Sequence, residues 1–130
     1  MNQATARDIL RAQQALDEAM ELALWHASRG VQAEQKEGGS PVTVADREID
    51  QLLRAQLPEG SDGWLSEETP DDEARLSCSR VWVVDPIDGT RSFLAGRSDY
   101  SVSIALLVDR QPVLGAVGAP AQGVQVVGGV

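Results

Sequence analysis

The chain has 130 residues and a formal net charge of −9, because 20 acidic residues outnumber 11 basic ones. A chain of this length can bury a core of its own, so we expect a single domain. The acidity argues against binding to a nucleic-acid polymer or an anionic membrane, which require clustered Lys and Arg, and implies that a phosphorylated ligand needs bridging cations.

The first predicted element is a long amphipathic helix. Apolar residues recur at helical spacing from about Ala4 to Arg29, and Gly30 follows as a stop signal. We interpret His26 as a structural or surface residue near the helix end, where the dipole favours a cation, and Trp25 as a core or interface residue.

A short strand is predicted from Val31 to Lys36, followed by a loop from Glu37 to Pro41. A second helix then begins with Thr43 as its N-cap and ends at Pro58. Asp46, three residues after Thr43, completes a capping box, and capping alone explains this aspartate without any function.

Two apolar runs are each followed by carboxylates, as is typical of strands whose carboxyl ends carry chemistry. The first, Gly63 to Thr69, contains two adjacent glutamates. The second, Val81 to Val84, is β-branched and aromatic, and it should end at Pro86 because proline cannot donate to a β-ladder. Asp85 then lies at the end of that strand.

The segment after this strand combines acidic and phosphate-binding features. Asp88 and Gly89 predict a tight turn, and Thr90 opens a short helix whose first amides favour an anion. Asp85 and Asp88 can face one point, and hard oxygen ligands beside a phosphate site indicate Mg²⁺ and phosphoryl transfer to water. A turn with a purely conformational role is the alternative.

The C-terminal part is predicted to be a β-hairpin followed by one more strand. Tyr100 to Val108 alternates in polarity, Pro112 to Val117 returns as its partner, and Gln122 to Val130 offers the last strand. Arg97 and Asp99 precede the hairpin, where they either flank a substrate or form a surface ion pair.

Three blocks of sequence together resemble the inositol monophosphatase family of Mg²⁺-dependent phosphomonoesterases. The main block is Asp85-Pro86-Ile87-Asp88-Gly89-Thr90, preceded by Trp-Val-Val and followed by Phe93. The others are Lys36 with Pro41 to Asp46, and Leu65 to Thr69. The resemblance implies an α+β fold in which layered helices pack on a largely antiparallel sheet.

The resemblance also implies a role for each matching residue. The expected metal ligands are Glu67, Asp85, Asp88 and the Ile87 carbonyl, and the amides of Gly89 and Thr90 are expected to hold the phosphate. Glu67 and Thr90 would orient and deprotonate the attacking water. Asp46 is expected to join this catalytic group and, with Lys36, to support the metal site without being a direct ligand.

Family members extend well beyond the length of this chain, and their second half carries a Trp-Asp motif whose aspartate completes the metal site. Nothing in the 130 residues corresponds to that motif. We therefore expect residues 1–130 to be the N-terminal part of an inositol monophosphatase-like domain, with little or no activity on its own.

Within the family, the chain looks closest to the bacterial 3'(2'),5'-bisphosphate nucleotidases, although Gly118 stands where an aromatic residue is common. The expected substrate is a small phosphorylated metabolite such as adenosine 3',5'-bisphosphate. The alternatives are an inositol-1-phosphate phosphatase and a catalytically silent module that assembles with a partner.

Assembly and location are the remaining expectations. Val102, Ile104, Leu106 and the strand Val124 to Val127 are expected to present apolar surface or an open edge that a second copy covers, giving a homodimer. Cys78 is the only cysteine, and no signal pattern or membrane-length apolar run is present, so we expect a cytoplasmic protein.

Overall fold

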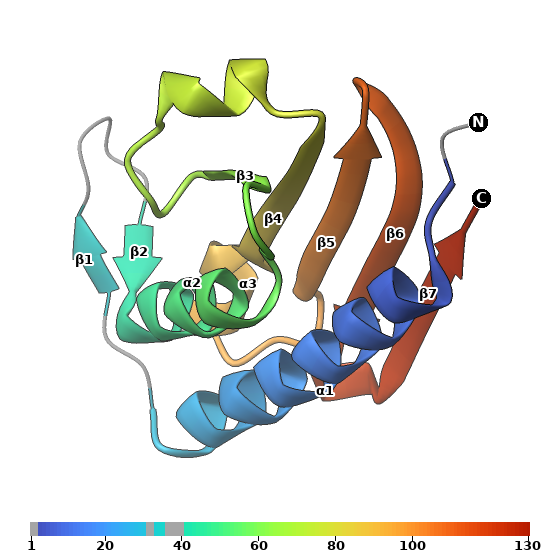
Figure 1. The fold of residues 1–130 in the computed structure, drawn as a ribbon. Coiled ribbons are helices and arrows are strands. Elements are labelled where there is room, and N and C mark those ends of the chain that lie inside the picture. The colour runs from blue at the N-terminus through green and yellow to red at the C-terminus, as the bar shows by residue number, and fades with distance from the viewer. Residues whose placement is uncertain (1–2, 31–32, 36–40) are drawn as a thin grey trace.

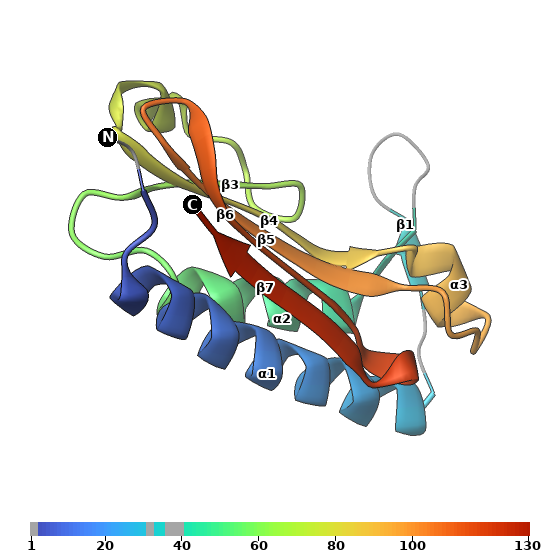
Figure 2. The same ribbon diagram turned by 90° about the vertical axis from the view of Figure 1, so that its right-hand side faces the viewer.

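The structure, a computed structural model, describes residues 3–30, 33–35 and 41–130. Its centre is a five-stranded sheet, and the helices α1 (Ala6–Ser28) and α2 (Val44–Gln56) both lie against one face of that sheet (Figures 1 and 2). Within the described ranges no helix is long and apolar enough to cross a membrane.

Both long helices begin with a capping box, of which the one at Thr43 was predicted from the sequence. Thr5 caps α1 and forms a capping box with Asp8, and Thr43 caps α2 and forms one with Asp46. Each box satisfies amides that the first helical turn leaves without intrahelical acceptors. The predicted stop at Gly30 is also confirmed, since this glycine adopts a positive φ of 75° directly after the C-cap.

The sheet is mostly antiparallel, as expected. Its strands lie in the order β3 (Gly63–Ser66), β4 (Arg80–Asp88), β5 (Ser101–Val108), β6 (Gln111–Ala119) and β7 (Val124–Gly129). Only the pair β3–β4 is parallel. The remaining elements are short: β1 (Ala33–Gln35), β2 (Pro41–Thr43), α3 (Thr90–Leu94) and the 3-10 turns η1 (Glu73–Ser77) and η2 (Pro120–Gln122).

Two strand boundaries differ from the prediction. Strand β4 does not end at Pro86: its register shifts between Asp85 and Asp88, and pairing resumes between Asp88 and Ser101. A bulge accommodates the proline because the residues within it need not donate to the ladder. Pro41 was predicted to lie in a loop but begins β2, which pairs with β1; proline is tolerated at the first position of a strand.

Alternating residues separate the two faces of the sheet. The face against the helices is the core, and Val102, Ile104 and Leu106 are at most 2% exposed there. The expectation that these three residues present apolar surface is therefore wrong, because α1 and α2 cover them. The opposite face carries Val117, which is 48% exposed, and Val126 beside it on β7, which is 69% exposed.

Gly118 has a packing explanation on the helix side of β6. A Cβ atom at this position would lie 2.4 Å from Met20 Sδ and 3.1 Å from Leu16 Cδ1. The side chains of Met20 and Leu16 on α1 therefore fill the space beside Gly118, and a larger residue there would have to displace them. The space that an aromatic side chain would need is filled by Met20.

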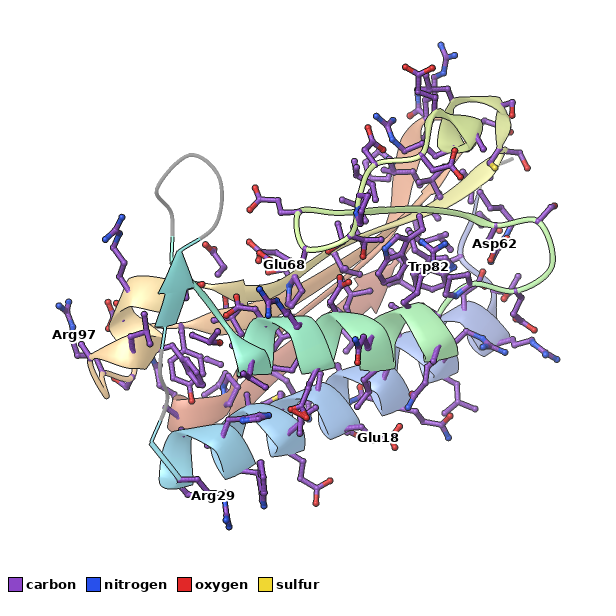
Figure 3. All side chains as sticks on the ribbon, turned by 90° about the vertical axis from the view of Figure 1, so that its left-hand side faces the viewer. Glu18, Arg29, Asp62, Glu68, Trp82 and Arg97 are labelled. Atoms are coloured by element: carbon purple, nitrogen blue, oxygen red, sulfur yellow. The ribbon has the colours of Figure 1, made fainter. Side chains whose placement is uncertain are left out.

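An ionic network fixes the other end of the sheet. Arg80 on β4 donates to Asp8 on α1 at 2.7 Å and to Asp62 at 3.0 Å, and Trp82 Nε1 donates to Asp62 at 3.1 Å. Figure 3 shows Trp82 and Asp62 side by side above the C-terminal end of α2. The two chain ends also meet here, since Ala4 N donates to Val130 O at 2.7 Å.

Candidate active site

The parallel pairing of β3 and β4 brings the two acidic strand ends together. Ser66, the last residue of β3, is the register partner of Val84 on β4. Glu67 therefore leaves the sheet beside Asp85, because parallel strands present their carboxyl ends at the same edge. The two predicted carboxylates become neighbours through this register.

Both carboxylates line one hollow of about 1080 Å³ on the uncovered face of the sheet. Its acidic end is formed by Glu67, Glu68 and Asp85, with Arg47 of α2 also in the lining. Its floor is apolar and includes Leu65, Val83, Ala105 and Val117. Figure 3 shows Glu68 above the N-terminal half of α2, at this end of the molecule.

Asp85 lies in a strongly acidic environment. Burial raises the pKa of its carboxyl to about 6, with further contributions from the charges of Asp88, Glu67, Asp46 and Glu68. Both causes disfavour the ionised form, and a nearby cation is the usual means of stabilising such a cluster of carboxylates. The donor set thus suits a hard divalent cation.

The structure does not close these groups into a complete metal site. Within the described residues no three His, Cys, Asp or Glu side chains lie close enough together to hold one ion. Glu67 and Asp88 are exposed at the surface, and the charges of both contribute to the raised pKa of Asp85. Lys36, expected to support the site, lies outside the described residues.

Thr90 contacts Asp46. The Thr90 hydroxyl lies 3.1 Å from Asp46 Oδ1 and 3.2 Å from the Ile87 carbonyl oxygen, and it can donate its proton to one of them at a time. Asp46 is 1% exposed, and its Oδ2 accepts from the Thr43 amide and hydroxyl. Capping and a link to the site are therefore combined in one carboxylate.

Gly89 is required by the turn that leads into α3. Its φ is 91°, and a Cβ atom there would lie 2.8 Å from the carbonyl oxygen of Asp99. Only glycine satisfies both constraints at no cost. The predicted turn and the short helix that begins at Thr90 are confirmed.

Four residues of uncertain role do not line this hollow. Arg97 and Asp99 form an ion pair at 3.4 Å in which both side chains are exposed. His26 Nε2 lies 2.8 Å from Glu48 Oε2, close in distance but not aligned for a hydrogen bond, so it links α1 to α2 as a structural residue. Trp25 is 52% exposed, which contradicts a place in the core.

Asp50 was missed by the sequence analysis. It is 5% exposed and accepts hydrogen bonds from the hydroxyls of Ser66 and Thr69. A signal was present, because Asp50 lies four residues after Asp46 and so shares the buried face of α2 with Ile49 and Leu53. A carboxylate on a buried helix face needs a partner, and its partners flank the two glutamates.

The sequence profile of the inositol monophosphatase family matches residues 5–129. The chain belongs to this family. It is 39% identical over 121 residues to a histidinol-phosphatase from Chlorobaculum parvum, an alignment that covers 89% of this chain and 45% of the relative. It is 37% identical over 102 residues to the 3'(2'),5'-bisphosphate nucleotidase CysQ of Salmonella typhimurium, covering 75% of this chain and 41% of that one.

Solved structures of inositol monophosphatase family members share the fold. The crystal structure of CysQ from Bacteroides thetaiotaomicron superposes with a TM-score of 0.78 at 30% identity, over 95% of this chain and 46% of that one. The expected α+β fold and the resemblance to the bisphosphate nucleotidases are thus confirmed. The chain spans less than half the length of the curated relatives described above.

Proposed function

We propose that this inositol monophosphatase family chain contributes the metal and phosphate site of a Mg²⁺-dependent phosphomonoesterase. The observation that carries the proposal is the placement of Glu67 and Asp85 at adjacent ends of parallel strands, lining one hollow. The family match over residues 5–129 supports the reaction class. The raised pKa of Asp85 supports a site suited to cations.

Four groups of this chain would hold the metal: the carboxylates of Glu67, Asp85 and Asp88 and the carbonyl oxygen of Ile87. When bound, Mg²⁺ supplies positive charge that lowers the barrier to attack on a phosphate ester. The backbone amides of Gly89 and Thr90 hold the phosphate at the turn into α3. Glycine at position 89 lets the ligand approach the backbone closely.

The chain also offers a route for the proton of the attacking water. When the Thr90 hydroxyl donates to Asp46, its oxygen lone pairs face away from that carboxylate and can accept a proton from water. Asp46 then takes the threonine proton. Glu67, at the adjacent end of β3, orients the same water, and Lys36 supports the site.

The proposed substrate is a small phosphate ester such as adenosine 3',5'-bisphosphate, because relatives that act as bisphosphate nucleotidases match this chain. A second candidate is histidinol phosphate, favoured by the histidinol-phosphatase that aligns with 89% of the chain. Inositol 1-phosphate is the third, as a substrate of the family at large. All three present one phosphate to the same acidic site.

The extent of the chain bears on its activity and assembly. Residues 1–130 would be the N-terminal part of the family's domain, with low activity on their own and a cytoplasmic location. We propose that a second copy covers the uncovered sheet face, where Val117, Val124 and Val126 are all about half exposed or more. A catalytically silent assembly module remains the alternative from a different functional class.

The test is Mg²⁺-dependent phosphate release from the three substrates under one set of conditions, with the chain alone and with the remainder of a relative added in trans. The expected result is low turnover alone, a gain on complementation, and loss of that gain in Asp88→Asn. Complementation that proceeds equally well with Asp88→Asn would refute the metal site. Preference among the substrates decides the specificity.

A further inference from the structure

Asp50 has contacts that the proposed chemistry does not use. It lies on α2 one helical turn after Asp46, and its side chain is 5% exposed. Ser66 Oγ donates to Asp50 Oδ1 at 2.5 Å, and the Thr69 hydroxyl donates to Oδ2. Both oxygens of this buried carboxylate are therefore engaged by hydroxyls of a single segment.

Ser66 and Thr69, which carry these hydroxyls, flank Glu67 and Glu68 in the sequence. Strand β3 ends at Ser66, so the glutamates are the first residues beyond the support of the ladder. The Glu68 amide donates to Ser66 Oγ at 3.3 Å, and Trp64 Nε1 donates to Thr69 Oγ1 at 3.3 Å. The segment from Ser66 to Thr69 is thus tied by side chains to a rigid helix.

The same helix holds the other half of the site. Asp46, four residues before Asp50, binds Thr90 at the turn after β4. Helix α2 therefore fixes the segments that follow both acidic strands, one through each aspartate. The relative placement of Glu67 and Asp85 depends on these two anchors.

We infer that Asp50 is a positioning residue that holds the Ser66–Thr69 segment so that Glu67 faces Asp85, and that it thereby sets the affinity of the acidic site for Mg²⁺. This inference rests on the proposed function for its metal. Outer groups that orient metal ligands commonly change affinity about 10- to 100-fold when they are removed. Asp50 itself contacts neither metal nor substrate.

The experiment compares the same chemical change at two buried carboxylates. Asp50→Asn keeps the side-chain volume, but its amide nitrogen cannot accept the proton of the second hydroxyl. Asp8→Asn is the matched control, because Asp8 is 3% exposed and bonded to Arg80 in the network at the other end of the sheet. Thr69→Val removes one of the two hydroxyl bonds and serves if Asp50→Asn fails to fold.

Two measurements are made on each variant: calorimetric titration with Mg²⁺, and hydrogen exchange of the amides at residues 67–69. For Asp50→Asn we expect Mg²⁺ to bind about 10-fold or more weakly and these amides to exchange faster, whereas Asp8→Asn should change neither. Unchanged affinity and exchange in both Asp50→Asn and Thr69→Val would overturn the inference.

Glu67→Gln separates this inference from the proposed function. If the unsubstituted chain and Glu67→Gln bind Mg²⁺ equally well, or neither binds it, the proposed metal site is wrong and the effect on affinity goes with it. If Glu67→Gln loses binding and Asp50→Asn does not, only the positioning role is wrong. In either case, amide hydrogen exchange at residues 67–69 tests whether Asp50 holds the Ser66–Thr69 segment in place.

Discussion

The hydroxyl of Thr90 lies 3.1 Å from Oδ1 of Asp46, which joins helix α2 to the turn after β4. Asp46 is 1% exposed and carries the capping interactions of the same helix on its other oxygen. One buried carboxylate thus serves a helix terminus and the candidate active site together. Removing the Thr90 hydroxyl should therefore lower the stability of the fold and also impair the candidate active site.

Thr90→Val keeps the shape of the side chain but leaves Oδ1 of Asp46 without this donor. We expect the free energy of unfolding to fall by about 1–3 kcal/mol, because a buried acceptor loses its partner. Thr90→Ser retains the hydroxyl and should lose much less. Urea unfolding of the three proteins measures the difference, and equal losses in both variants would contradict the role of this bond.

Gly89→Ala should destabilise the chain more than Gly123→Ala. Both glycines have positive φ, 91° and 65°, so an alanine strains the backbone at either position. At Gly89 the added methyl also meets the Asp99 carbonyl at 2.8 Å, while at Gly123 nothing lies within 4 Å. We expect a loss of about 1 kcal/mol at Gly123 and clearly more at Gly89, measured by urea unfolding. Equal losses of stability in the two variants would show that the backbone around Gly89 shifts to accommodate the methyl group at no cost.

Protonation of Asp8 should lower the stability of the fold in acid. Its burial alone would raise the pKa, but hydrogen bonds from Arg80 and Thr5 outweigh this and hold the pKa below the ordinary value of 3.8. A depressed pKa stabilises the fold above the unfolded value, and this contribution is lost as the pH falls through the folded value. Asp8→Asn should therefore flatten the loss of stability below about pH 4.

Glu18→Gln, on the exposed side of α1, is the control for this experiment. Thermal unfolding of each protein is followed from neutral pH into acid. Glu18→Gln should retain the acid dependence of the unsubstituted chain. The same steep loss in Asp8→Asn would assign the dependence to other carboxylates.

Asp85→Asn should stabilise the chain when divalent cations are removed. The pKa of Asp85 is raised from 3.8 to about 6, so the folded state binds the proton more tightly and loses stability as the pH rises through that interval. At pH 7 we expect a gain of about 1–2 kcal/mol, less than the full shift because solvent screens this half-buried group. Urea unfolding in the presence of a chelator measures it.

Adding Mg²⁺ should make the unsubstituted chain more stable than Asp85→Asn, the reverse of the order in chelator. The ion should stabilise the unsubstituted chain by binding its carboxylates and should stabilise Asp85→Asn far less, because one ligand charge is gone. A variant that is less stable than the unsubstituted chain in chelator would show that the Asp85 charge is needed for folding. Equal stabilisation by Mg²⁺ would remove Asp85 from the metal site.

Local signals predicted much of this structure. The capping box at Thr43, the turn at Gly89 and the hairpin after Val108 depend on neighbouring residues, which a single sequence displays. The continuation of β4 past Pro86 was not predictable in this way, because it depends on Ser101 of the next strand. Which face of β5 the helices cover is likewise a tertiary property.

The same distinction between local and long-range features applies to the candidate site. Its carboxylates were recognisable from their place after apolar runs and from the family resemblance. The partners of Asp50 and Asp46 were not, since these bonds join residues 16 and 44 positions apart in the chain. Polar side chains on a buried helix face were the one visible clue to such long-range bonds.

Val117→Glu should weaken self-association of the chain. Val117 is 48% exposed on the uncovered face and pairs with Val126 of β7, so the two form a continuous apolar surface at the sheet edge. Burying this surface against a second copy would remove it from water, and a carboxylate there would oppose the contact.

Val44→Glu is the matched control: Val44 is also 48% exposed but lies at the start of α2, where an acidic residue suits the helix dipole. Sedimentation velocity over a concentration series should show dimers for the unsubstituted chain and Val44→Glu, and monomers for Val117→Glu. A monomeric unsubstituted chain would refute the proposed dimer, and a dimer that persists in Val117→Glu would place the contact on another face.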